Sequence, residues 1–153
     1  YRRMHNINSR IMRIFNTYGP RMRSDDGRVV SNFIVQALEG KPLTIYGEGK
    51  QTRSFCFVDD LIKGMMKLMD SDIYTPVNIG NPEQFTILEL ANRIKELINP
   101  NLKFIYKPLP EDDPLQRQPN IEKAVQELSW SPEVPLEDGI KLTIEWFKKE
   151  YFS

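Results

Sequence analysis

The chain has 153 residues, 40% of them apolar, so it can bury one hydrophobic core of ordinary size. Its 21 Lys and Arg residues balance 21 Asp and Glu residues. That balance excludes a global field that attracts nucleic acid or an acidic membrane, so any anion site must be local.

The lone cysteine, Cys56, excludes a disulfide framework, and we expect it to pack as a small buried hydrophobe. No apolar run approaches the roughly 18 residues of a membrane span. We therefore expect a cytoplasmic protein without a membrane partner, an expectation that does not cover residues upstream of Tyr1. Because Tyr1 is not a start methionine, we expect the chain to be part of a longer protein.

The first elements follow from apolar periodicity. Residues 10–15 are β-branched and apolar enough for a strand, and residues 16–20 end it with turn chemistry. Apolar residues then recur at helical spacing between residues 30 and 38, and Gly40 supplies a left-handed stop. The pattern predicts a short amphipathic helix.

The middle of the chain predicts two short strands, residues 43–46 and 54–58, around the turn at residues 47–50. Asp59 or Asp60 is expected to cap a following helix. One face of that helix is predicted to fill the core with these apolar residues: Leu61, Ile62, Met65, Met66 and Met69.

The last third predicts further alternating elements. Thr86 and Glu89 form a capping box for a helix bearing an apolar face. The other predicted elements are a strand at residues 77–79, a strand at 102–106, a loop at 108–119, a helix capped by Asn120, and a final helix whose apolar residues are Leu136, Ile140, Ile144, Phe147 and Tyr151. The mixture predicts an α/β or α+β fold with too few and too short strands for a complete doubly wound sheet.

Stand-alone catalytic designs are not evident. The sequence has no Gly-rich dinucleotide loop, no zinc spacing and no Ser-His-Asp order, since His5 is the only histidine; we expect no metal site. Arginines remain, on predicted loops: Arg28, Arg53 and Arg117. Together they could clamp a diphosphate by bidentate charged hydrogen bonds, while the alternative for each is simple solvation.

A series of short motifs extends along nearly the whole chain: residues 13–22 (RIFNTYGPRM), 26–34 (DGRVVSNFI), 46–47, 51–55, 58–60, 78–81, 112–114 with Arg117, and 130–132. In this order they resemble the extended short-chain dehydrogenases/reductases that act on nucleotide sugars. The wording of residues 13–22 and 26–34 is most similar to the UDP-glucuronate decarboxylases.

The resemblance implies an α/β fold in which residues 1–153 are the C-terminal, nucleotide-sugar-binding portion. They would supply the last sheet strands of an extended Rossmann-type (NAD-dependent epimerase/dehydratase) fold and a small mixed α/β substrate-binding subdomain. The NAD-binding portion, with its Gly-rich motif and catalytic Tyr-x-x-x-Lys, is expected upstream, and we take both motifs to be absent from this chain. A homodimer is expected for the full-length protein.

The resemblance also implies roles for single residues. The expected substrate contacts are Asn16 and Asn32 near the diphosphate, Tyr46 in the uracil pocket, Gln51, and Arg53 with Arg117 as the diphosphate clamp. The expected cofactor contacts are Thr17, Arg23 and Arg28, although relatives often carry His in place of Arg23. Arg28 is the candidate catalytic residue, near the substrate carboxylate; its alternative is to orient the loop, and that of Tyr46 is core packing.

The implied function is NAD-dependent conversion of UDP-glucuronate to UDP-xylose and carbon dioxide, and the chain alone is expected to be inactive. A nucleotide-sugar 4,6-dehydratase or 4-epimerase is the alternative within enzymes. A non-catalytic nucleotide-sugar-binding module is the alternative from another class.

Overall fold

The computed structural model describes residues 2–110 and 116–152 as a mixed α/β fold, as predicted. Its helices are α1 (Arg2–His5), α2 (Val29–Leu38), α3 (Val58–Met69), α4 (Ile87–Ile98), α5 (Glu122–Leu128) and α6 (Leu136–Tyr151). Its strands are β1 (Met12–Ile14), β2 (Thr17–Tyr18), β3 (Leu43–Tyr46), β4 (Thr52–Ser54), β5 (Cys56–Phe57), β6 (Val77–Ile79), β7 (Gln84–Thr86), β8 (Phe104–Lys107) and β9 (Gln116–Arg117).

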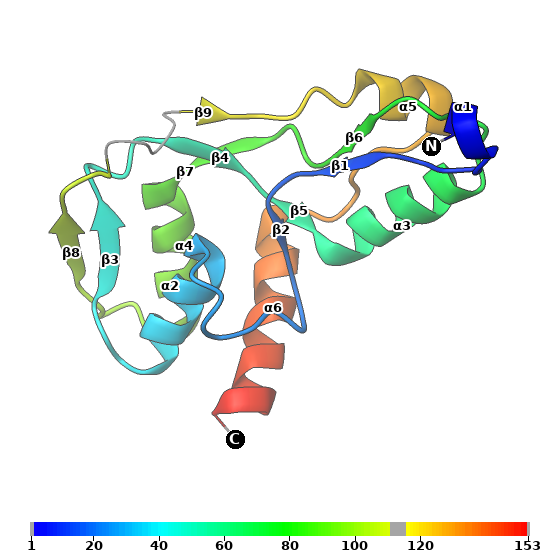
Figure 1. Cartoon of the computed structure of the whole chain (residues 1–153). Coiled ribbons are helices and arrows are strands. Elements are labelled where there is room, and N and C mark those ends of the chain that lie inside the picture. The colour runs from blue at the N-terminus through cyan, green and yellow to red at the C-terminus, as the bar shows by residue number, and fades with distance from the viewer. Residues whose placement is uncertain (1, 111–115, 153) are drawn as a thin grey trace.

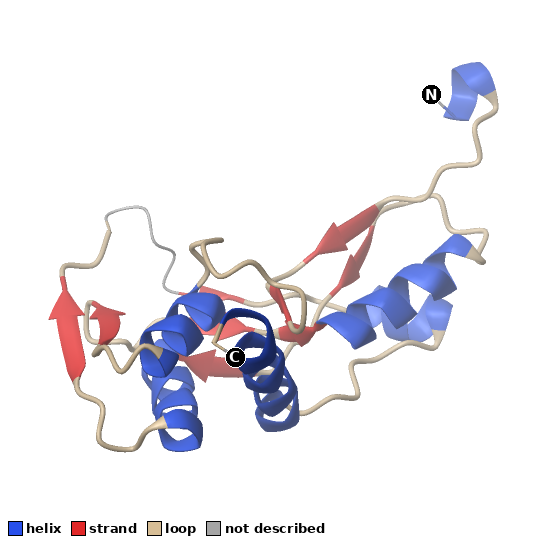
Figure 2. Ribbon diagram, turned by 90° about the horizontal axis from the view of Figure 1, so that it is seen from below, coloured by secondary structure: helices blue, strands red, loops and turns tan. Residues whose placement is uncertain are grey.

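The molecule is elongated, with two lobes on either side of helix α6 (Figure 1). One lobe holds the β1–β6 pair with α3 and α5, and the other holds the β3–β8 pair, the β7–β4–β9 sheet and helices α2 and α4. The β2–β5 pair lies where the lobes meet, beside α6. Helix α1 stands away from the rest of the fold (Figure 2).

Parallel pairing joins segments that are far apart in the sequence. β1 pairs with β6, β2 with β5, and β3 with β8, all in parallel. Such pairs need long crossover connections, which is why helices separate the strands along the chain. Among the described residues the largest sheet has three strands, β7–β4–β9, in keeping with the predicted shortage of strands.

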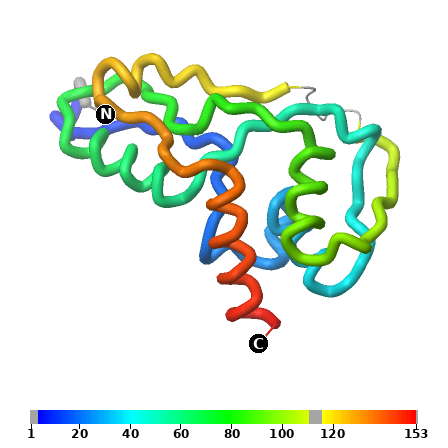
Figure 3. The backbone as a smooth tube through the Cα atoms, turned by 180° about the vertical axis from the view of Figure 1, so that it is seen from behind, coloured from blue at the N-terminus to red at the C-terminus, as the bar shows by residue number. Residues whose placement is uncertain are grey.

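Each lobe has its own hydrophobic cluster. The larger one gathers apolar side chains of α2, α4 and α6 against β3 and the β2–β5 pair, including Phe33, Leu90 and Phe147. The smaller one gathers α3, α5 and β6 residues around Trp130. The view from behind shows α6 running along the larger lobe beside α4 and α2 (Figure 3).

Helix α3 corrects two predictions. It begins at Val58 with Phe57 as its N-cap residue, so Asp59 and Asp60 lie inside the first turn and neither caps it. The predicted core face is also wrong, because Met66 and Met69 are 58% and 64% exposed. The buried side of α3 instead carries these residues: Asp60, Gly64 and Leu68.

Other boundaries shift by a few residues. The predicted strand at residues 54–58 is wrong as one element, since the chain forms β4 and β5 on either side of Phe55. The N-cap residue of α5 is Ile121 and not Asn120 as predicted. Asn120 Oδ1 still accepts the backbone N–H of Glu122 at 2.9 Å. The predicted loop at 108–119 contains β9, and its residues 111–115 lie outside the described part of the chain.

Candidate functional site

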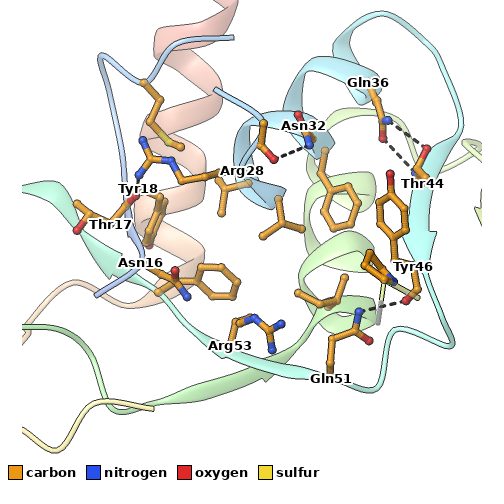
Figure 4. A pocket seen from close by; sticks show the side chains of 18 of the residues that line it. Asn16, Thr17, Tyr18, Arg28, Asn32, Gln36, Thr44, Tyr46, Gln51 and Arg53 are labelled. Atoms are coloured by element: carbon orange, nitrogen blue, oxygen red, sulfur yellow. Dashed lines mark hydrogen bonds between the residues drawn. The ribbon is translucent and has the colours of Figure 1, made fainter. Parts of the chain in front are cut away.

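A cavity of about 420 Å³ lies in the larger lobe, between the β2 segment and the start of α2 on one side and strands β3 and β4 on the other (Figure 4). Its walls combine apolar rings with amide, hydroxyl and guanidinium groups. The polar and charged side chains that line it are Asn16, Thr17, Tyr18, Arg28, Asn32, Gln36, Thr44, Tyr46, Gln51, Arg53 and Lys107.

The cavity brings together most of the residues singled out from the sequence. Those that line it are Asn16, Thr17, Arg28, Asn32, Tyr46, Gln51 and Arg53. They come from four separate segments of the chain, and Figure 4 shows them around one open space. Arg23 and Arg117 are not among the described lining residues.

The charged side chains among the described lining residues of the cavity are all positive. Arg28, Arg53 and Lys107 line it, and no Asp or Glu does so among the described residues. The whole chain, by contrast, has zero net charge. The positive charge is therefore concentrated locally, which suits a ligand that carries several negative charges.

Arg28 is the N-cap residue of α2, and its side chain is 55% exposed. Its Nε donates to Asp26 Oδ2 at 2.8 Å and its Nη1 donates to the Thr17 carbonyl at 3.0 Å. Burial opposes the charged form of Asp26, but hydrogen bonds from Ser31 and Arg28 and the Arg28 charge outweigh it. These contacts keep the pKa of Asp26 below its usual value.

Asn32 lies one turn into α2 rather than at its first residue. Its Nδ2 donates to the Gly27 carbonyl at 3.0 Å, which ties the helix to the turn in front of it. Gly27 has φ +76°, a left-handed conformation that glycine adopts without strain. The amide thus holds the loop that carries Arg28, and its expected contact with a diphosphate stays a prediction.

The core-packing alternative for Tyr46 is wrong, because this side chain is 44% exposed and lines the cavity. Around it the backbone of β3 is fixed by two glutamines. Gln36 Oε1 accepts the Thr44 N–H at 3.1 Å, and Gln51 Nε2 donates to the Tyr46 carbonyl at 3.1 Å. Figure 4 shows both contacts as dashed lines beside the Tyr46 ring.

Gln36, Thr44 and Lys107 were not predicted as site residues. In the sequence, Gln36 occupies one polar position of an amphipathic helix, and Thr44 and Lys107 are ordinary strand residues. Lys107 reaches the cavity because β3 pairs with β8, with Tyr46 opposite Lys107, and Gln36 reaches it because helix α2 packs beside β3. A pairing between strands so distant in sequence leaves no local signal.

Arg53 and Arg117 occupy neighbouring strands. Arg53, on β4, is only 9% exposed, lines the cavity and donates from Nη1 to the Thr52 carbonyl at 2.8 Å. Arg117, on β9, is the register partner of Arg53, so both side chains start from the same face of the sheet. Arg117 is exposed, and its joint clamp with Arg53 stays a prediction.

Arg23 points to a different partner. Its guanidinium pairs with Asp25 at 2.9 Å on an exposed loop, and the hydrogen bond from Arg23 lowers the pKa of Asp25. Of the three expected cofactor contacts, only Thr17 and Arg28 lie at the cavity. Their contact with the cofactor stays a prediction.

The spacing Tyr-x-x-x-Lys does occur once, at Tyr46 and Lys50, which corrects the expectation that the chain lacks it. The five residues span a turn with left-handed Gly47 and Gly49, and no helix covers them. Lys50 is exposed and paired with Glu48, and it does not line the cavity. The spacing therefore does not place an ammonium group beside a tyrosine hydroxyl here.

The described residues form neither a cluster suited to a metal ion nor a helix suited to a membrane. Within residues 2–110 and 116–152, no group of three His, Cys, Asp or Glu side chains is arranged to hold a metal ion. Within the same ranges no helix is both long and apolar enough to cross a membrane.

A sequence model of the NAD dependent epimerase/dehydratase family matches residues 1–80. The chain belongs to this family. Curated relatives are similar over the full length of the chain: UDP-glucuronic acid decarboxylase 4 of Arabidopsis thaliana is 54% identical over 100% of it, and UDP-glucuronic acid decarboxylase 1 of Danio rerio 51% over 98%. The chain covers 34% and 36% of these two proteins, about a third of their length.

Solved structures of this epimerase/dehydratase family share the fold. UDP-glucuronic acid 4-epimerase from Bacillus cereus, in complex with UDP-glucuronic acid and NAD, superposes with a TM-score of 0.89 at 33% identity over 99% of this chain and 48% of that chain. UDP-glucose 4-epimerase from Thermotoga maritima, with UDP-glucose, gives 0.92 at 31% identity over 97% and 48%. The arrangement of elements described above is thus the one found in these family members.

Proposed function

We propose that this chain forms the nucleotide-sugar-binding part of an NAD-dependent UDP-glucuronate decarboxylase, which converts UDP-glucuronate into UDP-xylose and carbon dioxide. The observation that carries the proposal is the cavity: three cations and no carboxylate among its described lining residues, in a chain of zero net charge. Similarity to UDP-glucuronic acid decarboxylases over the whole chain supports the choice of substrate. The proposal includes a cytoplasmic homodimer of the complete protein.

The uracil ring is assigned to the open edge of β3. Leu43 and Gly47 donate their N–H groups to the carbonyls of Lys103 and Lys107, so the alternating residues Thr44 and Tyr46 direct their backbone groups away from β8. Gln36 accepts the Thr44 N–H and Gln51 donates to the Tyr46 carbonyl. The Thr44 carbonyl and the Tyr46 N–H therefore remain on this edge as an acceptor and a donor. That pair matches the N–H and carbonyl of a uracil imide, and the Tyr46 ring offers a stacking face.

The diphosphate is assigned to Arg53 and its surroundings. Arg53 is nearly buried at the cavity wall, where a guanidinium gains more from an anion than it does in water. Asn16 and Asn32 lie on the same cavity and add amide groups of the kind that phosphate oxygens accept from. Arg117, beside Arg53 in register, would complete the clamp at the edge of the site.

The sugar is assigned to the end of the cavity formed by Thr17 and Arg28. NAD, when bound, would supply the hydride chemistry: a hydride would leave carbon 4 to make a ketone β to the glucuronate carboxylate, and it would return to carbon 4 after carbon dioxide is lost. Arg28 holds this carboxylate by charge-assisted hydrogen bonds and stabilises charge as carbon dioxide leaves. Thr17 and Arg28 are the residues of this chain that would face the nicotinamide end of the cofactor.

The test uses a polypeptide that extends this chain upstream to the length of its curated relatives. With UDP-glucuronate and NAD it should release carbon dioxide and form UDP-xylose. Arg28→Ala should slow carbon dioxide release about 100-fold or more, the typical loss for one preorganised charge-stabilising group. The matched control, Lys41→Ala, removes an exposed cation paired with Glu39 away from the cavity. Undiminished carbon dioxide release would remove Arg28 from the mechanism.

A 4-epimerase is the second candidate, because solved relatives of this fold at 33% and 31% identity are 4-epimerases. It would keep the carboxylate and invert the sugar at carbon 4. A 4,6-dehydratase acting on UDP-glucose would instead yield a keto-deoxy sugar. Product analysis with UDP-glucuronate and UDP-glucose separates the three, since only the decarboxylase produces a pentose.

A further inference from the structure

One carboxylate, Asp26, contacts three separate groups of the segment that carries Arg28. Its Oδ2 accepts from Arg28 Nε at 2.8 Å. Its Oδ1 accepts from the Arg28 backbone N–H at 3.0 Å and from the Ser31 hydroxyl. Both the backbone and the side chain of Arg28 are thus tied to the same acidic group.

The turn around Asp26 is anchored from two further directions. Ser31 is fully buried, and its hydroxyl also reaches the Arg28 carbonyl at 2.9 Å. Asn32 holds the Gly27 carbonyl at 3.0 Å. Because the anchoring residues belong to helix α2, the turn is fixed to a rigid element rather than to a mobile loop.

Asp26 and Thr17 engage two of the three nitrogens of the Arg28 guanidinium. Nε is taken by Asp26, and one N–H of Nη1 donates to the Thr17 carbonyl at 3.0 Å. A guanidinium has five N–H groups, so Nη2 and the second N–H of Nη1 remain. These form the edge that binds a carboxylate in bidentate fashion, and Asp26 lies on the other side of the group.

We propose that Asp26 is a positioning residue, which fixes the guanidinium of Arg28 so that its Nη1–Nη2 edge faces the carboxylate of the bound sugar. This inference rests on the proposed function, in which Arg28 holds that carboxylate. A free arginine side chain loses much of its rotamer freedom when it is ordered. Asp26 orders it before the ligand arrives, which strengthens the carboxylate contact.

The decisive variant is Asp26→Asn. The amide oxygen can still accept from the Arg28 backbone N–H and from Ser31, so the turn is retained. An NH₂ group replaces the oxygen that faces Arg28 Nε, and two donors cannot bond each other. Asp25→Asn is the matched control, since it removes an equal charge from the adjacent position, whose partner is Arg23.

Binding is measured on the polypeptide that extends this chain upstream, with UDP-glucuronate and UDP-glucose as probes. The readout is the dissociation constant of UDP-glucose divided by that of UDP-glucuronate. This ratio reports recognition of the carboxylate separately from recognition of the nucleotide. Asp26→Asn should reduce the preference for UDP-glucuronate about 10-fold, the scale of one charge-assisted hydrogen bond. Asp25→Asn should leave the ratio unchanged, and Asp26→Asn should add nothing in an Arg28→Ala background.

The possible results separate the two proposals. If Arg28→Ala lowers the preference for UDP-glucuronate and Asp26→Asn leaves that preference unchanged, the role of Asp26 alone is overturned. An equal loss of affinity for both probes in Asp26→Asn also overturns it, because such a loss reports a structural role only. An unchanged ratio in Arg28→Ala means that Arg28 does not hold the carboxylate, which overturns both the inference and that part of the proposed function.

A second measurement needs no ligand. In the 153-residue chain, the Arg28 Nε–H should exchange slowly with water by nitrogen-15 NMR, because it is bonded to a carboxylate. Exchange should become about 10-fold faster in Asp26→Asn, as expected for the loss of a contact of about 1.4 kcal/mol, and stay unchanged in Asp25→Asn. Equal exchange rates in Asp26→Asn and the unaltered chain would overturn the proposal whatever the ligand experiments give.

Discussion

Gly139 lies where the first turn of α6 passes closest to strands β2 and β5. A Cβ atom at this position would meet the Tyr18 hydroxyl and would lie 2.8 Å from Phe57 Cδ2. Tyr18 is fully buried and donates to the Leu136 carbonyl at 3.3 Å, and burial is the main cause that raises its pKa. The absence of one side chain therefore sets how near α6 comes to the strand next to the cavity.

Gly139→Ala should lower the free energy of unfolding by about 1–3 kcal/mol, the usual cost of overpacking a core. The loss should appear although alanine favours helix over glycine by about 1 kcal/mol. Urea denaturation followed by circular dichroism measures it. Leu142→Ala, an exposed change on the same helix, should stay within about 0.5 kcal/mol. A Gly139→Ala chain as stable as the original would show that this approach is not tight.

Helix α4 is the element that the sequence predicted best, because its start is encoded locally. The Thr86 hydroxyl accepts the Glu89 N–H at 3.1 Å, and the Glu89 carboxylate accepts the Thr86 N–H at 2.7 Å. Two residues three apart make this capping box without help from the rest of the fold. The hydrogen bond from the Thr86 backbone is the main cause that lowers the pKa of Glu89.

Thr86→Ala should therefore lower the free energy of unfolding by about 1 kcal/mol at neutral pH. The contribution of Glu89 has a definite pH dependence. Because its pKa is lower in the folded chain, it stabilises fully above the ordinary value of 4.5 and is lost as the pH falls through the lowered pKa. The difference in the free energy of unfolding between the original chain and Glu89→Gln should thus disappear at acidic pH. Glu96→Gln, an exposed change on the same helix that leaves the capping box intact, is the matched control.

Helix α3 shows where sequence reasoning reaches its limit at this scale. Ile62, Met66 and Met69 have the spacing of a core stripe, and the prediction placed them inside. The structure turns the helix so that Gly64 and Leu68 face the interior, with Gly64 close against Trp130 and Ile79. Which face packs depends on partners at positions far along the chain, and periodicity alone cannot identify them.

The candidate site likewise contains some residues that the sequence could predict and others that it could not. Arg28, Asn32 and Gln51 belong to sequence motifs, so a resemblance pointed to them and the structure placed them at one cavity. Gln36 and Lys107 carry no motif and come to the cavity through helix packing and strand pairing. Arg117 has a motif, yet it sits on the outer strand β9, beyond the described lining of the cavity.

At the scale of the whole molecule, the cavity depends on one of the two hydrophobic clusters. Five of its apolar lining residues belong to the larger cluster, together with buried residues of α6: Met22, Val30, Phe33, Phe55 and Ile87. The smaller cluster around Trp130 packs the other lobe. The cavity should therefore form wherever the larger lobe folds, whatever surrounds the second one.

A formed cavity still need not bind tightly. In the solved relatives with UDP-sugars, this chain matches 48% of the polypeptide, and ligands of such folds lie in a crevice bounded by both parts. UDP titrated into the 153-residue chain should bind with a dissociation constant near or above about 1 mM by calorimetry. Because the contacts are ionic and partly exposed, added salt should weaken them further.

Arg53→Ala should abolish this weak binding, since it removes the guanidinium nearest the proposed diphosphate position, whereas Lys41→Ala should not change it. Micromolar binding that depends on Arg53 would contradict the expected weakness and favour a binding module that works by itself. Micromolar binding that survives Arg53→Ala would contradict the diphosphate assignment. Repeating the titration on the upstream-extended polypeptide then measures how much affinity the second wall adds, which the two-part crevice predicts to be most of it.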